Sequence, residues 1–192
     1  MAAALILVTG PPASGKSTLA ARLAARYGWL PLAKDTIKES LFAVLGTGDA
    51  AWSRALSDAS FALQFALAGP LLERGASVML EGNFRPGEHE APIGRLLARH
   101  AAACAQILVT ADAMLRAARL AERARAGARH PGHRDAELAV QAAGGPAAAD
   151  AGSAALALSG ARFEVAGDGG AADFEALCRQ LDRWWSAAPT SP

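Results

Sequence analysis

The segment Leu5–Leu19 reads LILVTGPPASGKSTL, an apolar run followed by a glycine-rich turn and the start of an amphipathic stretch. The spacing G-x-x-x-x-G-K-[ST] begins at Gly10 and ends at Ser17, and it is typical of a phosphate-binding loop between a strand and a helix. Glycine lets such a loop turn tightly, and the backbone amides then point inward toward an anion. The following helix adds the partial positive charge of its N-terminus. The segment therefore predicts a site for a nucleoside triphosphate.

Two side chains of this loop have specific chemical tasks. Lys16 supplies a positive charge for the β- and γ-phosphates, and the Ser17 hydroxyl is a suitable ligand for Mg²⁺. A chance glycine-rich turn is the alternative, and the complete motif in its strand–helix context argues against it. We expect the loop to bind ATP through Gly10, Ala13, Ser14, Gly15, Lys16, Ser17 and Thr18.

Length and composition indicate an ordinary single domain over residues 1–192, with 52% hydrophobic residues to form its core. The net charge of +1 provides no basic field for nucleic acid, so nucleic-acid binding is not expected. The two cysteines, Cys104 and Cys178, lie in apolar segments, which favours a reduced protein in the cytoplasm. The apolar N-terminal run is too short to span a membrane, so no membrane association is expected. The oligomeric state stays open.

Five apolar segments separated by helical patterns predict an α/β fold. It is a doubly wound, five-stranded parallel sheet in the three-layer α/β/α arrangement of P-loop NTPases and kinases. The expected strands are residues 5–9, 29–33, 77–80, 105–110 and 162–166. Helices are expected over 17–27, 36–74 with a turn at 46–49, the end of 87–100, 113–126, 137–142, and a last helix from about 171. Residues 187–192 are expected to form a frayed tail.

One of the expected helices is apolar on more than one face. It places Leu56, Leu63 and Leu67 on one stripe, with Phe61 and Phe65 elsewhere around the helix. We expect it to pack between the sheet and a neighbouring helix. An apolar wall of an acceptor pocket is the alternative.

Asp35 follows the second expected strand, at the edge of the sheet where open α/β folds bind their ligands. A carboxylate across the phosphate site can contact an acceptor and take the proton of its attacking hydroxyl. The alternative is an N-cap for the next helix, and the two roles are compatible.

A stripe of arginines occupies the helix before a Gly/His/Pro-rich segment. Arg116 and Arg123 lie nearly in line, with Arg119 beside them. Arginines on a closing lid neutralise charge during phosphoryl transfer and help exclude water. We therefore expect a lid near 116–135, in which Arg119 binds nucleotide and Arg123 assists catalysis. A solvated helix face is the alternative.

Polar residues also end the third strand. We expect Glu81 to hold Mg²⁺ together with Ser17, and Asn83 and Arg85 to contact the acceptor. Ordinary strand-end turn chemistry is the alternative. The pair His130 and His133 flanks a Pro-Gly turn, and a turn is favoured there over a metal site.

These segments together resemble the AAA_33, or zeta-toxin-like, small P-loop kinases, a group similar to chloramphenicol phosphotransferase, gluconate kinase and the kinase half of polynucleotide kinase. The resemblance rests on residues 10–18, KDTIKESLF at 34–42, LEGNF at 80–84 and RLAERARAGARHPGHRD at 119–135. It implies ATP-dependent phosphorylation of a hydroxyl, with Asp35 as the base and Lys16 as the phosphate clamp. By the same resemblance, Arg119 and Arg123 are the lid contacts. Many relatives carry an Asp with a Thr-Asn pair at positions 81–83, where this chain has Glu-Gly-Asn.

The sequence therefore favours an enzyme, a kinase that uses ATP and Mg²⁺ to phosphorylate a hydroxyl of a small molecule. We expect the acceptor between Asp35, Arg85 and the helical segment 40–70. A kinase for the 5′-hydroxyl of a polynucleotide and a toxin-type kinase for a nucleotide sugar are alternatives. A nucleotide-binding switch without transfer chemistry is an alternative of another class.

Overall fold

A five-stranded parallel sheet forms the centre of the protein, with the strand order β2-β3-β1-β4-β5. The computed structural model describes residues 3–127, 129–143 and 154–187. The strands are β1 (Ala4–Thr9), β2 (Leu30–Ala33), β3 (Val78–Glu81), β4 (Ala103–Thr110) and β5 (Ala161–Ala166). The predicted fold class and all five strands are confirmed, although β4 begins two residues earlier than predicted.

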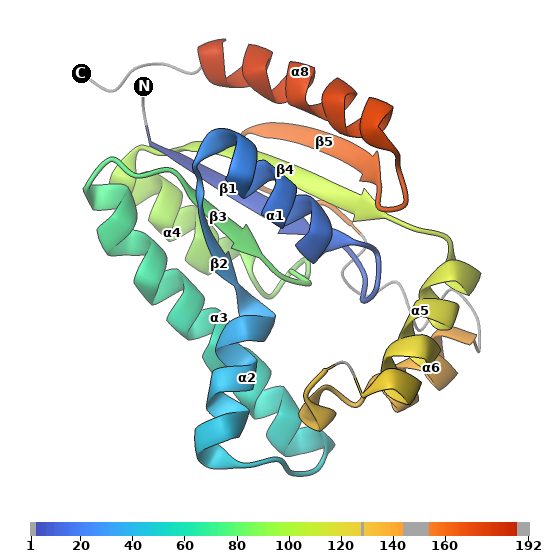
Figure 1. Cartoon of the computed structure of the whole chain (residues 1–192). Helices are drawn as coiled ribbons and strands as arrows, with labels where there is room; N and C mark the ends of the chain where they lie inside the picture. Colours follow the sequence, from blue (N-terminus) through green and yellow to red (C-terminus); the bar gives the residue numbers. More distant parts are fainter. Residues whose placement is uncertain (1–2, 128, 144–153, 188–192) are drawn as a thin grey trace.

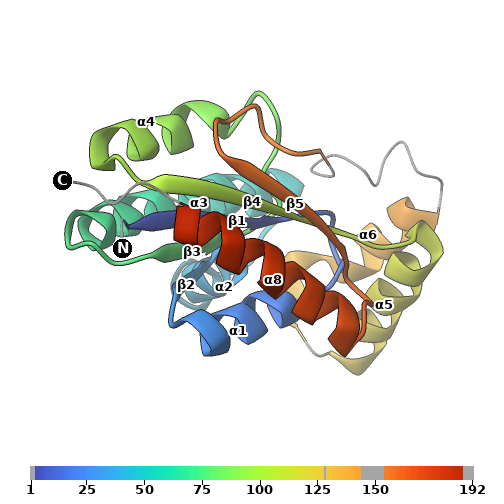
Figure 2. The ribbon, with the colours of Figure 1, turned by 90° about the horizontal axis from the view of Figure 1, so that it is seen from above.

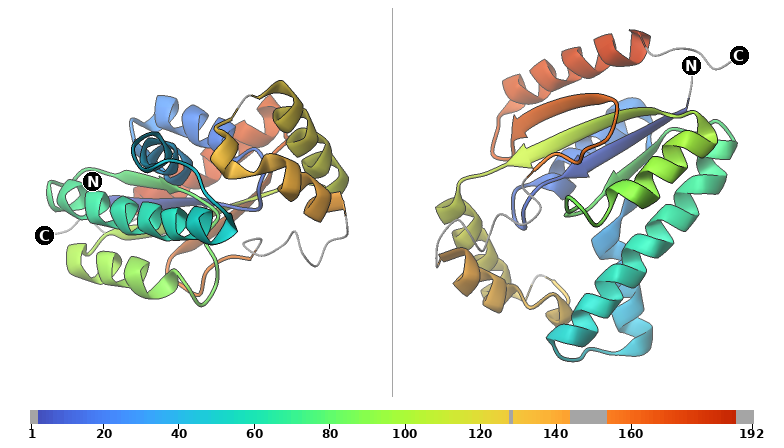
Figure 3. Two further views of the ribbon diagram at one scale, coloured as in Figure 1. Left: turned by 90° about the horizontal axis from the view of Figure 1, so that it is seen from below. Right: turned by 180° about the vertical axis from the view of Figure 1, so that it is seen from behind.

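The central strand β1 is buried on both faces, and its alternating side chains enter two separate cores. Ile6 and Val8 pack with α1 (Lys16–Tyr27) and α8 (Ala171–Ala187). Leu5 and Leu7 pack against α3 (Ala50–Glu73) and α4 (Glu90–His100) on the opposite face. Figures 2 and 3 show the sheet between these two helix pairs. The result is the predicted three-layer arrangement.

The remaining helices gather beyond the carboxyl ends of the strands. They are α2 (Lys34–Leu45), α5 (Ala113–Ala126), the 3₁₀ helix η1 (Pro131–His133) and α6 (Asp135–Ala143) (Figure 1). The Asp112 carboxylate caps α5 by accepting from the backbone amides of Met114 and Leu115. The segment predicted as a loop contains η1, and α6 starts two residues before the helix predicted there. Residues 144–153 and 188–192 lie outside the described part of the chain.

Helix α3 differs from its sequence-based interpretation. Pro70 lies inside the helix, which continues to Glu73. Leu56 is buried, but Leu63 and Leu67 are 43% and 50% exposed, so the predicted leucine stripe is not the packed face. The packed face is partly polar: its buried residues are Ser53, Leu56, Ser60, Phe61, Gln64, Ala68 and Leu72.

Helix α3 also has the length and apolar composition of a membrane-spanning helix, the one such case in the described residues. This is weak evidence, because core helices of soluble proteins satisfy the same criteria. The Gln64 amide within α3 donates to the backbone carbonyls of Leu32 and Glu81. The helix is therefore tied to the ends of β2 and β3.

Candidate functional site

The phosphate-binding loop lies between β1 and α1, as predicted, and its glycines are required by geometry. Gly10 has φ 146° and Gly15 has φ 101°, both in the region that favours glycine. A Cβ on Gly10 would lie 2.2 Å from the Val109 carbonyl oxygen. No side chain caps the start of α1, so its first amides face the loop. The loop therefore offers the anion site expected at a helix N-terminus.

Lys16 points back over the loop. Its Nζ donates to the Pro11 carbonyl oxygen at 2.7 Å. Burial lowers the pKa of Lys16 to about 8, opposed by the negative charges of Glu81 and Asp35. Arg123 lowers that pKa further, which places the lid arginine within the electrostatic reach of Lys16. A dianionic phosphate in the loop would restore the protonated form of this lysine.

Ser17 and Glu81, the two predicted metal ligands, lie side by side. The Ser17 hydroxyl donates to Glu81 Oε2 at 3.4 Å. Glu81 is buried, has no basic partner within 4 Å among the described residues, and burial raises its pKa. A buried carboxylate without a cation fits a divalent metal, with the remaining ligands from phosphates and water. The described residues contain no cluster of three or more His, Cys, Asp or Glu that could hold a metal.

The turn between β5 and α8 packs closely against the phosphate-binding loop. A Cβ on Gly167 would lie 1.5 Å from the Ser14 carbonyl oxygen. A cavity of about 130 Å³ opens beside this contact, between α1 and the turn. Its lining includes Thr18, Arg22 and Asp168. Nothing in the sequence pattern indicated contact between this turn and the phosphate-binding loop.

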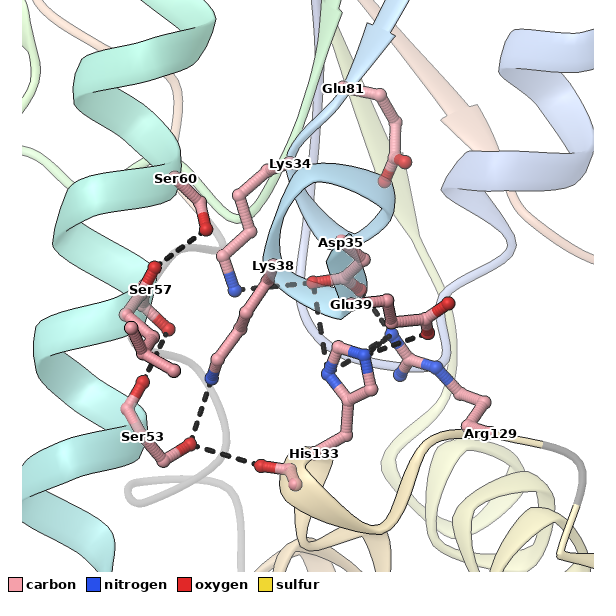
Figure 4. Close-up of polar contacts among 12 residues, drawn as sticks. Lys34, Asp35, Lys38, Glu39, Ser53, Ser57, Ser60, Glu81, Arg129 and His133 are labelled. Carbon is pink, nitrogen blue, oxygen red and sulfur yellow. Dashed lines mark hydrogen bonds and ion pairs between the residues drawn. The ribbon is translucent and has the colours of Figure 1, made fainter. Parts of the chain in front are cut away.

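Asp35 occupies the first turn of α2, and the predicted N-cap role is wrong because Ala33 is the N-cap. Lys34 Nζ donates to Asp35 Oδ1 at 3.1 Å, and Arg129 forms an ion pair with Oδ2 (Figure 4). Burial alone would raise the pKa of Asp35, but Lys34, Arg129 and His133 together hold it well below its usual range. Asp35 is therefore ionised at neutral pH, with each oxygen engaged.

The η1 segment packs against α2 and α3. The His130 ring stacks on Phe42 at 5.0 Å, and a Cβ on Gly132 would lie 2.5 Å from the same ring. His133 Nε2 lies 2.8 Å from Glu39 Oε1, and burial lowers the pKa of this histidine. Because a carboxylate only accepts hydrogen bonds, the ring donates from Nε2 to Glu39. These contacts hold Arg129, which also lies 3.5 Å from the Asp135 carboxylate, over Asp35.

The chain contains three lysines among its 19 basic residues, and all three lie in this region: Lys16, Lys34 and Lys38. Lys34 and Lys38 are 6% and 5% exposed. Both project from α2 toward α3, where Ser53, Ser57 and Ser60 lie opposite them (Figure 4). Helix α2 thus carries a base candidate and two buried cations within its first two turns.

Helix α5 reaches the loop from the other side. Arg119 Nη1 donates to the Ala13 carbonyl oxygen at 3.1 Å. Leu120 packs on Ala13, with α6 residues behind it. The predicted lid helix is therefore in contact with the nucleotide loop in this structure.

Comparison with known proteins decides the family. Residues 5–144 match the AAA_33 family, whose description is AAA domain. The chain belongs to the AAA_33 family. A search of curated proteins found no significant match.

Solved structures agree with the AAA_33 assignment. A protein from Chloroflexus aurantiacus, named as an inferred kinase, has a TM-score of 0.82 and 29% identity, covering 96% of this chain and 99% of that one. A sugar kinase from Janibacter sp. has a TM-score of 0.53 and 14% identity over 97% and 96% of the two chains. A structure from the PezAT toxin–antitoxin system of Streptococcus pneumoniae has a TM-score of 0.52 and 15% identity over 68% and 56%. The last two show a shared fold. The AAA_33 protein therefore shares its fold with small P-loop kinases.

In this AAA_33 protein the residues predicted to contact the acceptor are less closely grouped than those predicted to bind the nucleotide. Asn83 is partly exposed just beyond β3. Arg85 Nη1 instead donates to Glu88 Oε2 at 3.3 Å, and the described contacts do not join it to Asp35. Its predicted role with the acceptor stays a prediction.

Several residues of the AAA_33 site were missed from the sequence. They are Lys34, Lys38, Ser53, Arg129, His133 and Gly167. The sequence did carry a signal for Lys34 and Lys38. Nearly all basic residues of the chain are arginines, and its lysines occur only in the phosphate loop and near Asp35. The others depend on contacts between segments more than 70 residues apart.

Proposed function

We propose that this protein is an ATP-dependent kinase that transfers the γ-phosphate to a hydroxyl of a small molecule. The observation that carries the proposal is the position of Asp35. Ala33 pairs with Glu81 across β2 and β3, so Asp35, two residues further along, lies near Glu81, and Glu81 in turn contacts Ser17 of the phosphate-binding loop. A nucleotide switch without transfer chemistry has no need of an ionised carboxylate at that place.

The nucleotide occupies the loop and the cavity beside it. Its phosphates accept from the loop amides and from Lys16. The cavity between α1 and the Gly167 turn receives the nucleoside end. Arg119 and Arg123 approach from α5, where their charges stabilise the phosphate oxygens. Ser17 and Glu81 would hold Mg²⁺, which supplies further neutralisation of phosphate charge.

Asp35 accepts the proton of the attacking hydroxyl. A carboxylate with a lowered pKa is a weak base, but phosphoryl transfer passes through a loose transition state that asks little of the base. The acceptor hydroxyl takes the place of Arg129 at one carboxylate oxygen. Lys34 stays on the other oxygen and keeps the carboxylate oriented.

Replacing Asp35 by Asn tests the proposal. Acceptor-dependent ADP release should fall about 10²- to 10⁴-fold, while nucleotide affinity changes little. Glu73→Gln, at an exposed residue that ends α3, is the control and should leave both unchanged. The panel should contain hydroxylated metabolites, aminoglycoside- and phenicol-type antibiotics, a 5′-hydroxyl oligonucleotide and a nucleotide sugar. If nucleotide binds but no compound stimulates ADP release, the switch interpretation replaces the kinase.

A further inference from the structure

The facing sides of α2 and α3 carry polar side chains, although the sequence predicted an apolar helix over α3. Ser53 and Ser60 on α3 are 9% and 0% exposed, and Ser57 lies between them. The hydroxyls of Ser57 and Ser60 donate to carbonyl oxygens one turn earlier in α3, at 3.1 and 2.6 Å. Their oxygens therefore remain able to accept hydrogen bonds from a ligand.

Lys38 is the residue of this lining whose charge is left uncompensated. Its Nζ donates to Ser53 Oγ at 2.8 Å and lies 5.1 Å from the centre of the Phe42 ring. No carboxylate lies within 4 Å of it among the described residues. An ammonium has three protons to donate, and burying it beside a single hydroxyl is costly. A buried ammonium group of this kind is suited to bind an anion.

The neighbouring carboxylates are already committed. Asp35 is shared between Lys34 and Arg129. Glu39 accepts from His133, and Asp135 pairs with Arg129. The charges of Asp35 and, more weakly, Asp58 act on Lys38, but neither carboxylate forms an ion pair with it. The anion that complements Lys38 must therefore come from outside this cluster.

We propose that the phosphoryl acceptor carries an acidic group, a carboxylate or a phosphate ester, which binds to Lys38 while its hydroxyl meets Asp35. This inference rests on the proposed kinase function. Asp35 and Lys38 are three residues apart on α2, so their side chains start from neighbouring points roughly 5–6 Å apart on the helix surface. That separation suits an acid and a hydroxyl on one small molecule. The α3 serines accept from its further hydroxyls.

Binding of matched compounds tests whether the acceptor carries an acidic group. The protein is first saturated with Mg²⁺ and a non-hydrolysable ATP analogue, so that added anions cannot occupy the phosphate-binding loop. Calorimetry then compares aldonic acids with their amides, and sugar phosphates with the free sugars. We expect at least one acid to bind about tenfold or more tightly than its neutral counterpart. The two pairs distinguish a carboxylate from a phosphate ester.

Variants of Lys38 assign the effect to this residue. Lys38→Met should abolish the preference for the acid, and Lys38→Arg should retain most of it. Arg95→Met, which removes an exposed cation of α4, is the control and should keep the preference. Equal binding of acids and neutral counterparts, or a preference that survives Lys38→Met, overturns the inference. A variant that unfolds is identified by its thermal melting, and Lys38→Gln then replaces it.

Measurements of ADP release and phosphate transfer distinguish failure of this inference from failure of the kinase proposal. If neutral hydroxyl compounds drive ADP release as well as acids do, the kinase stands and the acidic acceptor is wrong. If acids bind through Lys38 but no phosphate is transferred to any compound, the acid site stands and the kinase proposal fails.

Discussion

At the scale of single residues, the phosphate-binding loop is the part of the site that the sequence predicts best. Its spacing alone identifies Gly10, Gly15, Lys16 and Ser17, because a loop that wraps an anion needs these residue types in this order. The partner that closes the loop from outside, Gly167, could not be predicted. Its role depends on a contact with Ser14 across 153 positions of sequence, for which the local pattern carries no information.

Gly167→Ala tests that contact. A Cβ at this position would overlap the Ser14 carbonyl, so the loop or the turn must shift. We expect a loss of about 1–3 kcal/mol in the free energy of unfolding and at least about tenfold weaker nucleotide binding. Thermal melting and nucleotide titration provide the two measurements.

The same turn offers a matched control for Gly167. A Cβ on Gly170 would meet no heavy atom within 4 Å beyond its chain neighbours, and the backbone there is not left-handed. Gly170→Ala should therefore leave nucleotide binding unchanged. Wild-type stability and affinity in Gly167→Ala would show that the loop does not depend on this turn.

At the scale of elements, helix α3 shows where hydrophobic patterning misleads. Its leucines suggested a packed stripe, yet Leu63 and Leu67 face outward while Ser60 and Gln64 are fully buried. Alanine and serine fit a close helix–helix contact as well as leucine does, and buried hydroxyls can bond to their own helix. The sequence pattern counts apolar residues and cannot show which polar ones find a partner. The acceptor lining was missed for this reason.

The η1 segment is a second element whose order depends on distant contacts. Gly132 lies against the Phe42 ring, and Ser53 Oγ donates to the Gly132 carbonyl oxygen at 3.1 Å. Gly132→Ala would force the ring and the backbone apart and release the segment from α2. We expect faster hydrogen exchange across residues 129–135 and a raised KM for the acceptor, with nucleotide affinity retained.

A second substitution identifies the Phe42 ring as the cause. Phe42→Leu in the Gly132→Ala background makes room for the added methyl group and should slow the exchange again. If Gly132→Ala leaves the exchange of residues 129–135 at the wild-type rate, the segment is not held by this contact.

At the scale of the whole molecule, the sequence predicts the architecture and the nucleotide side of the site. Five apolar segments and one motif suffice, since βαβ connections leave few topologies for a parallel sheet. The proposed acceptor side is assembled from α2, α3 and η1, three elements whose mutual packing no local pattern specifies. The charge of Asp35 was predicted, but the cations that hold it were not.

The concentration of buried cations makes the stability of the free protein depend on pH. Burial lowers the pKa values of Lys16 and Lys38 to about 8, whereas an unfolded lysine titrates near 10.5. Above pH 8 the unfolded chain binds more protons than the folded one, so the free energy of unfolding should rise. From pH 8 to 9 we expect the free energy of unfolding to rise by about 1 kcal/mol for each lysine. Chemical denaturation at several pH values measures this.

Ionisation of Cys104 changes the free energy of unfolding in the opposite direction at higher pH. Burial raises the pKa of Cys104 to about 11, so above pH 9 the folded chain keeps a proton that the unfolded chain loses. The free energy of unfolding should therefore rise more slowly above pH 9 than the two lysines alone would make it. The double variant Lys16→Met, Lys38→Met should lack the rise between pH 8 and 9. A rise of equal size in that variant would assign it to other groups.

The placement of the three lysines has a practical consequence for handling this protein. An amine-reactive reagent finds side-chain targets only at Lys16, Lys34 and Lys38. Acylation of any of them removes a cation from this region, whereas the arginine side chains that carry the other positive charges do not react with such reagents. Coupling through lysine to a resin, a dye or a cross-linker thus acts as an active-site modification. Ligands that cover these amines will protect them, which makes lysine acylation a direct footprint of site occupancy.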